Sequence, residues 1–120
     1  MKIAFPVEKE SGAEQEVSLH FGPSPWFAVM GGDGKAGSPI KNTSAHFGGS
    51  MMPVELLAGQ GVKAIICCDM GPKAVEMCEK FAVEAYFVPA GTTVREAFAM
   101  HAAGKLAKAK NGDGCKSHSK

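Results

Sequence analysis

The sequence predicts an α/β protein built on an open mixed sheet of about five strands, with helices on both faces. Short apolar runs bounded by glycine, proline or polar residues recur along the chain, as they do in strands. In the second half these runs alternate with segments of helical periodicity, which is typical of sheets with right-handed crossovers. The chain has 120 residues, 45% hydrophobic and 21% charged, enough for one core and too few for two domains.

The first half of the chain supplies three of the expected strands. Residues 2–7 form a short apolar strand, followed at residues 8–15 by a polar loop that belongs at the surface. Residues 25–30 form the second strand. The Gly-Gly-Asp-Gly run at residues 31–34 offers the positive-φ positions of a turn into a third strand at residues 36–41. The second and third strands are therefore predicted to form a β-hairpin.

The second half begins with a helix and a buried strand. Ser50 is a candidate cap for a helix that runs to about residue 58, and Pro53 is tolerated in its first turn. Gly59 and Gly61 stop this helix. Residues 62–68 form a nearly continuous apolar run, typical of a strand covered on both faces. We therefore place this strand at the centre of the sheet.

Two further helices and one strand complete the expected fold. The helix predicted over residues 72–81 has one apolar stripe, made by Ala74, Met77, Cys78 and Phe81. Cys78 is therefore expected to pack in the core. Residues 85–88 form the last strand. The pattern at residues 93–96, Thr-Val-Arg-Glu, is a capping box that begins a helix ending near Gly104.

Residues 105–120 are predicted to be a flexible basic tail that follows a domain of residues 1–104. The whole chain has a formal charge of +1, whereas this segment holds five lysines and one aspartate. We interpret it as a solvated extension, with attraction of an anion as the alternative. Nucleic acid is not an expected partner, because the segment has neither aromatic residues nor arginines.

Cysteine usage and hydropathy favour a cytoplasmic protein. The four cysteines have no CxxC spacing and do not resemble a secreted disulfide framework. The first ten residues lack the long apolar run of a signal peptide. No segment approaches the roughly 18 apolar residues of a membrane span, so we expect no membrane partner.

Soft and imidazole side chains occur in three loops that are expected to converge. His20 precedes the second strand, His46 precedes the first helix, and the Cys67-Cys68 pair ends the buried strand. In open α/β sheets, ligands bind where loops meet beyond the carboxyl ends of strands. Imidazole, thioether and thiolate groups suit soft metals and iron–sulfur clusters. The candidate metal ligands are His20, His46, Cys67, Cys68, Cys115 and His118.

Glycines and methionines beside these ligands extend the candidate site. Glycine permits close approach of the backbone to a bulky ligand, and amides at helix starts stabilise anions. The candidate cofactor-binding residues are His20, Gly22, His46, Gly49, Met51, Met52 and Gly71. The methionines have core packing as their alternative interpretation. The histidines have a surface or hydrogen-bonding position as theirs.

The cysteines leave further alternatives open. Neighbouring residues of a strand point to opposite faces, so Cys67 and Cys68 share a pocket only if the strand has already ended. One of the two is expected in the core. Cys115 and His118 have a workable ligand spacing on the tail, where they either close over a bound cluster or have no metal role.

A series of short motifs runs in order along residues 1–104. The motifs are KIAFP at 2–6, VSLHFG at 17–22, Asn42 with His46 and the glycines at 48–49, VELL at 54–57, GV at 61–62, MGPKA at 70–74 and GTTVREA at 91–97. Together they resemble the dinitrogenase iron–molybdenum cofactor-binding family, which includes NifX-type carriers and the C-terminal domain of NifB-type proteins. The resemblance implies a ribonuclease-H-like fold, without that enzyme's acidic active site, and binding of anionic metal–sulfur clusters.

By position, His20 and His46 match the family's histidines, and Gly71 begins its helix-start motif. The chain departs from the family at Cys67-Cys68, where related sequences often have small residues such as glycine. With seven methionines in the chain, these thiols are consistent with a different soft-metal preference. The family's orange proteins, for example, bind a molybdenum–copper sulfide cluster. The expected cofactor is therefore a cluster of Fe/Mo/S or Mo/Cu/S composition.

The sequence thus predicts a non-enzymatic carrier or storage protein for an anionic metal–sulfur cluster. It would act as a monomer or a cluster-bridged dimer and exchange its cluster with assembly or acceptor proteins. One alternative is a thiol-based redox enzyme with Cys68 as a low-pKa nucleophile. Another is a regulatory module that responds to metal or cluster status. Catalysis by paired carboxylates is disfavoured, because Asp69 is the single acid in the predicted site.

Overall fold

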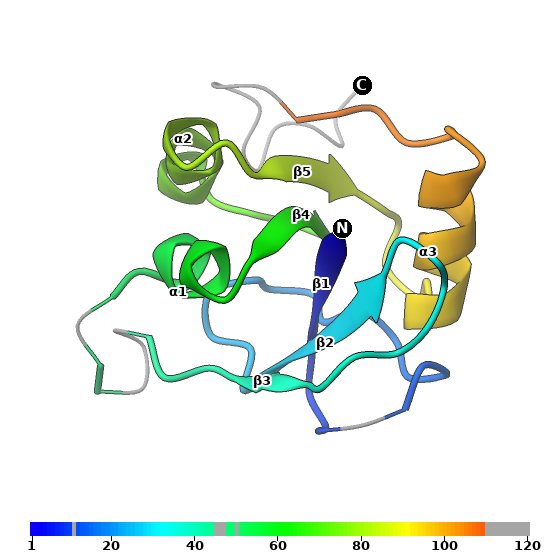
Figure 1. Ribbon diagram of the computed structural model, residues 1–120, viewed down its shortest axis with the longest axis horizontal. Helices are drawn as coiled ribbons and strands as arrows, with labels where there is room; N and C mark the ends of the chain where they lie inside the picture. Colours follow the sequence, from blue (N-terminus) through cyan, green and yellow to red (C-terminus); the bar gives the residue numbers. More distant parts are fainter. Residues whose placement is uncertain (11, 45–47, 50, 110–120) are drawn as a thin grey trace.

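Within the described residues, five strands form one open mixed sheet in the order β3-β2-β1-β4-β5 (Figure 1). The computed structural model describes residues 1–10, 12–44, 48–49 and 51–109. The strands are β1 (Lys2–Val7), β2 (Trp26–Gly31), β3 (Ile40–Lys41), β4 (Val62–Cys67) and β5 (Glu84–Phe87). β1 lies antiparallel to β2 and parallel to β4, and β4 is parallel to β5. The predicted α/β fold with a mixed sheet is confirmed.

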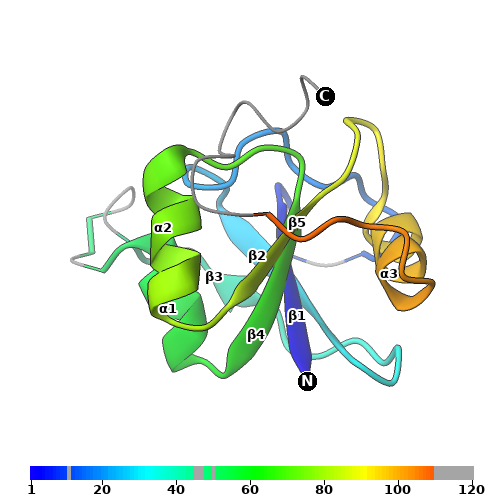
Figure 2. The same ribbon diagram turned by 90° about the horizontal axis from the view of Figure 1, so that it is seen from above.

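The helices cover both faces of this sheet, as expected. α1 (Pro53–Gly59) and α2 (Pro72–Lys80) lie together on one face, and α3 (Val94–Ala102) covers the other (Figure 2). Each face has its own core cluster, the first including Leu57 and the second Ala97. In β4, Ile65 belongs to the first cluster and Ile66 to the second. Alternate side chains of a strand point to opposite faces, so one buried strand serves both cores.

The middle position in the sheet belongs to β1, which corrects our placement of the strand predicted at residues 62–68. β1 pairs with β2 on one side and with β4 on the other. β4 is an internal strand beside it, covered on both faces as its apolar sequence predicted. The pairing of β1 with β4 matters for the site, because the two strands run parallel and therefore end at the same edge of the sheet.

The hairpin between β2 and β3 forms, but its second strand is shorter than predicted. Gly34 adopts a φ of +86° in the turn, and the Gly31 amide donates to the Lys35 carbonyl oxygen at 2.8 Å. We expected a strand over residues 36–41, whereas only Ile40–Lys41 pair regularly. Pro39 has no amide hydrogen for the ladder, which explains the interruption.

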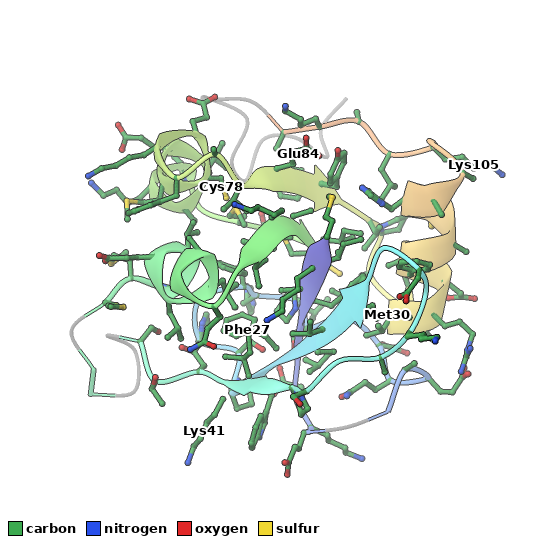
Figure 3. All side chains as sticks on the ribbon, viewed as in Figure 1. Phe27, Met30, Lys41, Cys78, Glu84 and Lys105 are labelled. Atoms are coloured by element: carbon green, nitrogen blue, oxygen red, sulfur yellow. The ribbon has the colours of Figure 1, made fainter. Side chains whose placement is uncertain are left out.

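The start of α3 follows its local signal, whereas α1 begins without a side-chain cap among the described residues. Thr93 and Glu96 form the predicted capping box at the start of α3, with the Glu96 amide donating to Thr93 Oγ1 at 3.1 Å. α1 begins after Met52, whose side chain makes no cap hydrogen bond. The predicted cap, Ser50, lies outside the described residues. On α2, Cys78 is buried as predicted, and Figure 3 shows it between this helix and the sheet.

After α3 the chain crosses the outer edge of β5. The Ala109 amide donates to the Ala85 carbonyl oxygen at 2.7 Å, and Lys108 forms a bridge with Tyr86. Ala109 also packs against the core cluster of α1 and α2. The division between domain and tail at residue 104 stays a prediction, and residues 110–120 lie outside the described part. None of the described helices has the length and apolar character to cross a membrane.

Candidate functional site

A pocket of about 290 Å³ opens at the edge of the sheet where β1 and β4 end. Its walls come from three segments that are far apart in sequence. Residues 20–23 follow β1, residues 52–54 begin α1, and the third wall comes from the turn after β4 and the first two turns of α2. This is the position at which open α/β sheets bind ligands. The volume is near the lower end of the range for small-molecule sites.

The pocket brings together four of the predicted cofactor-binding residues. His20 and Gly22 come from the loop after β1, Met52 from the start of α1, and Gly71 from the start of α2. This convergence depends on the parallel pairing of β1 with β4, which places the residues that follow both strands at one edge. The sequence prediction that these loops meet is therefore matched by the geometry at these four positions.

Other predicted site residues lie elsewhere or outside the described residues. Met51 is 45% exposed and does not line the pocket, and neither does Gly49. A Cβ at Gly49 would lie 1.8 Å from the Thr43 carbonyl oxygen, so the tight turn requires glycine at this position. The turn therefore accounts for this glycine without the close approach of a ligand that the sequence suggests. Three predicted ligands lie outside the described residues, namely His46, Cys115 and His118.

Cys67 and Cys68 point to opposite sides of the sheet, as strand geometry required, and neither lines the pocket. Cys67 is fully buried, and burial raises the pKa of its thiol well above the ordinary value, with smaller contributions from the Cys78 and Cys68 thiols and from Asp69. Cys68 is half-buried, and its Sγ lies 3.7 Å from the Val17 carbonyl oxygen. Burial, and then Asp69 and Glu16, raise the pKa of Cys68.

These raised pKa values weaken two of our sequence interpretations. Metal ligation and nucleophilic attack both require the thiolate, which a raised pKa disfavours. The thiol-enzyme alternative needed a low pKa at Cys68 and a histidine beside it. His20 lines the pocket instead, whereas Cys68 packs against the core beneath α3. Both thiols thus lie outside the pocket, and metal ligation by Cys67 or Cys68 stays a prediction from the sequence.

Thioether sulfur is more abundant in the pocket than the sequence interpretation indicated. Met70 and Met77 line it together with Met52. The sequence pattern places Met77 in the core stripe of the helix and Met70 only within a family motif. Cys78 Sγ lies 3.9 Å from Met70 Sδ, so sulfur atoms continue into the core behind the wall. The spacing of Ala74 and Met77, three residues apart on one helix face, was the signal available for Met77.

The charged groups at the pocket favour an anionic guest near α2. Lys73 lines the pocket, and its Nζ lies 3.8 Å from Glu76 Oε1 in an exposed pair. Such a pair is weak in water, so the ammonium charge stays available. Gly71 at the start of α2 makes no side-chain cap, and helix starts attract negative charge. Asp69 opposes this trend, although its Oδ1 accepts a hydrogen bond from the Met70 amide at 2.9 Å.

The described residues contain no group of three or more histidine, cysteine, aspartate or glutamate side chains that could hold a metal ion. A bare divalent cation therefore lacks a complete ligand set in this part of the chain. Among the described residues, the pocket is lined by one imidazole, three methionines and the Asp69 carboxylate. The imidazole and thioether groups suit a soft metal that brings most of its own ligands.

Burial of Cys78 behind the pocket predicts a loss of stability at alkaline pH. Desolvation, and then Glu79, raise the pKa of Cys78 from 9.0 to about 12. Below pH 9 the thiol is protonated in both folded and unfolded chains and contributes no pH dependence. Between pH 9 and 12 the unfolded chain loses this proton first, so the free energy of unfolding falls by up to about 1.4 kcal/mol per pH unit.

Urea denaturation at pH 8, 9.5 and 10.5 measures this effect. Cys78→Ala should be less stable than the wild type at pH 8 because of its cavity, but its stability should fall less steeply as the pH rises. The hydrogen bond with Glu84 raises the pKa of Tyr86 to about 12. Tyr86 therefore adds a fall in the free energy of unfolding that is common to both proteins. Identical slopes for both proteins would contradict the assignment.

The sheet order and the position of the pocket define an α/β domain with a pocket at the carboxyl edge of its parallel strands. Residues 1–104 match the protein family described as dinitrogenase iron-molybdenum cofactor. The chain belongs to this family. The range of residues that we inferred from its motifs is thereby confirmed, and the open mixed sheet of five described strands agrees with the fold that the resemblance implied.

The chain is also similar to individual proteins over most of its length. MJ0580 of Methanocaldococcus jannaschii, a protein described as uncharacterised, is 30% identical over 113 residues, covering 90% of this chain and 91% of its own length. The structure of the apo form of the orange protein from Desulfovibrio gigas has a TM-score of 0.80 at 23% identity, covering 92% and 93% of the two chains. This likeness concerns the fold alone. A putative NifB protein from Thermotoga has a TM-score of 0.72 at 26% identity, covering 89% and 91%.

Proposed function

We propose that this protein binds an anionic metal–sulfur cluster in the pocket and carries or stores it without catalysing a reaction. The observation on which the proposal depends is the meeting of His20 with the thioethers of Met52 and Met77 in one pocket. Membership of a family named for the iron–molybdenum cofactor supports a cluster as the guest. Lys73 at the same wall supports a negative charge on it.

The donor set suits cargo that is held and then released. Proteins that keep iron–sulfur clusters permanently usually bind them through several cysteine thiolates, whereas none of the three cysteines that the structure describes lines this pocket. Imidazole and thioether groups are neutral ligands that suit soft metals. Methionine side chains are also polarizable and flexible, so they adapt to an irregular sulfide surface. A carrier that transfers its cluster to an acceptor protein benefits from such ligands.

We propose a cluster of Fe/Mo/S or Mo/Cu/S composition on the grounds of the family and its motifs, because the shape of the pocket does not specify the elements. His46, Cys115 and His118 remain proposed further ligands on the grounds of sequence. Cluster-assembly or acceptor proteins are the proposed partners, with the chain acting as a monomer or a cluster-bridged dimer. The cysteine usage suits a reducing compartment such as the cytoplasm.

Anaerobic reconstitution of the full chain with iron, molybdate, copper and sulfide tests the proposal. After desalting, the wild type should retain a visible chromophore, and metal and sulfide analysis should give its element ratios. Ala74→Trp places a large side chain in the pocket wall and should reduce retained metal at least tenfold. Ala74 is half-buried on α2 and lines the pocket.

Ala99→Trp is the matched control. Ala99 is exposed on α3, on the opposite face of the sheet. This variant should retain as much metal as the wild type. A folded wild type that retains no chromophore, or equal retention by both tryptophan variants, would contradict cluster binding in the pocket.

A further inference from the structure

A single buried side chain joins the His20 loop to the segment that follows β3. Asn42 is 1% exposed, and its Nδ2 donates to the Gly22 carbonyl oxygen at 2.8 Å and to the Ser24 carbonyl oxygen at 2.7 Å. Its Oδ1 accepts a hydrogen bond from the Ser44 amide at 3.0 Å. Both amide hydrogens and the carbonyl oxygen of the side chain are therefore used. Loss of any of these bonds would leave a buried polar group without a partner, which is costly.

The loop held by Asn42 forms one wall of the pocket. His20, Gly22 and Pro23 all line it, and Gly22 is one of the two residues that Asn42 holds. The flanks of this loop are fixed at the end of β1. The Ser18 amide donates to the Pro6 carbonyl oxygen at 2.7 Å, and Ser24 Oγ donates to the Val7 carbonyl oxygen at 2.8 Å. Asn42 reaches between these flanks, to the wall itself.

The other side of the connection is also fixed. The Asn42 amide donates to the Pro25 carbonyl oxygen at 3.0 Å, which holds its backbone against the start of β2. The Gly49 amide donates to the Ser44 carbonyl oxygen at 3.0 Å, which closes the second loop just beyond Asn42. The side chain of Asn42 is therefore held from both ends. Because its backbone is held against the start of β2, its side chain fixes the position of Gly22 relative to the sheet.

We propose that Asn42 is the positioning residue of the pocket. By holding Gly22 it fixes the wall of residues 20–23, and with it the direction in which the His20 imidazole enters the site. Sites bind tightly when their ligating groups are held in place by such supporting hydrogen bonds. The role toward a cluster rests on the proposed function, whereas the control of the loop does not.

Asn42→Asp separates the two halves of this role. Aspartate keeps an acceptor for the Ser44 amide, so the second loop retains its turn. It replaces the two-hydrogen donor by an oxygen that faces the carbonyl oxygens of Gly22 and Ser24, so the connection to the His20 loop is lost. Asn42→Ala removes both halves and introduces no buried charge, and it serves if the aspartate variant does not fold.

The apo protein provides the first measurement. In ¹⁵N relaxation experiments, the order parameters of residues 20–22 should be near about 0.85 in the wild type and fall below about 0.6 in Asn42→Asp. The chemical shifts of the His20 imidazole should change at the same time. Binding of tetrathiomolybdate, a small anionic molybdenum–sulfur chromophore, should weaken at least tenfold.

Thr93→Ala is the control for a general loss of stability. It removes the capping box of α3 on the opposite face and should cost about 1 kcal/mol, with neither change at the His20 loop. Unchanged relaxation in both Asn42 variants would overturn the inference, as would equal changes in Thr93→Ala. If the wild type fails to bind tetrathiomolybdate or to retain a cluster, the proposed function fails, while the relaxation data still decide the role of Asn42.

Discussion

Replacing His20 with alanine should raise the dissociation constant for tetrathiomolybdate at least tenfold, while the free energy of unfolding changes by less than about 0.5 kcal/mol. The two effects differ because His20 is exposed and lines the pocket without being part of either core cluster. Its removal deletes the imidazole from the site and leaves the packing intact. Titration followed by visible absorption measures the affinity, and urea denaturation measures the stability.

His101→Ala is the matched control for this prediction. His101 lies on α3, on the opposite face of the sheet. Its ring meets that of Tyr86 edge to face, with the ring centroids 4.8 Å apart. Its replacement should cost some stability and leave the affinity unchanged. If both histidine variants bind tetrathiomolybdate as the wild type does, the imidazole is not a ligand and the proposed pocket chemistry is wrong.

Replacing Gly49 with alanine should destabilise the protein by about 2–3 kcal/mol, as overpacking in a tight site does. The added methyl group would lie 1.8 Å from the Thr43 carbonyl oxygen and 3.2 Å from that of Ser44. Both contacts are with backbone, so the turn itself must open. Because Asn42 accepts from the Ser44 amide in this turn, binding of tetrathiomolybdate should weaken as well.

Gly59→Ala tests whether glycine replacement alone has this effect. A Cβ at Gly59 meets nothing within 4 Å, and the residue is the last of α1. Alanine is the better helix former, so this variant should be as stable as the wild type or slightly more stable. Urea denaturation of both variants provides the comparison. Equal stability of the two would show that the loop accommodates a side chain at residue 49.

The fold could be predicted where local signals decide the structure. The capping box of Thr93 and Glu96, the turn at Gly34 and the apolar run of β4 each act over a few residues, and each appears as expected. The length of β3 depended on Pro39, within the predicted strand itself, and the middle place of β1 depended on long-range pairing. Pattern alone does not determine which strands pair.

The site could be predicted only as far as the sheet topology specifies it. The rule that loops meet at the carboxyl edge brought His20 and Met52 together correctly. It could not assign the faces of Cys67 and Cys68, because that requires the residue at which the strand ends. Met77 has the spacing of a core residue and lies at the boundary between core and pocket. Periodicity does not distinguish these two environments.

The crossing of residues 108–109 over β5 limits how other chains can attach to this molecule. Open sheets recruit partners by adding a strand to an unpaired edge. Here one edge is the two-residue β3, and part of the other is already occupied by the chain's own backbone. An acceptor protein would therefore meet this molecule through side-chain surfaces, such as the helices and loops around the pocket, and not by backbone pairing along the sheet.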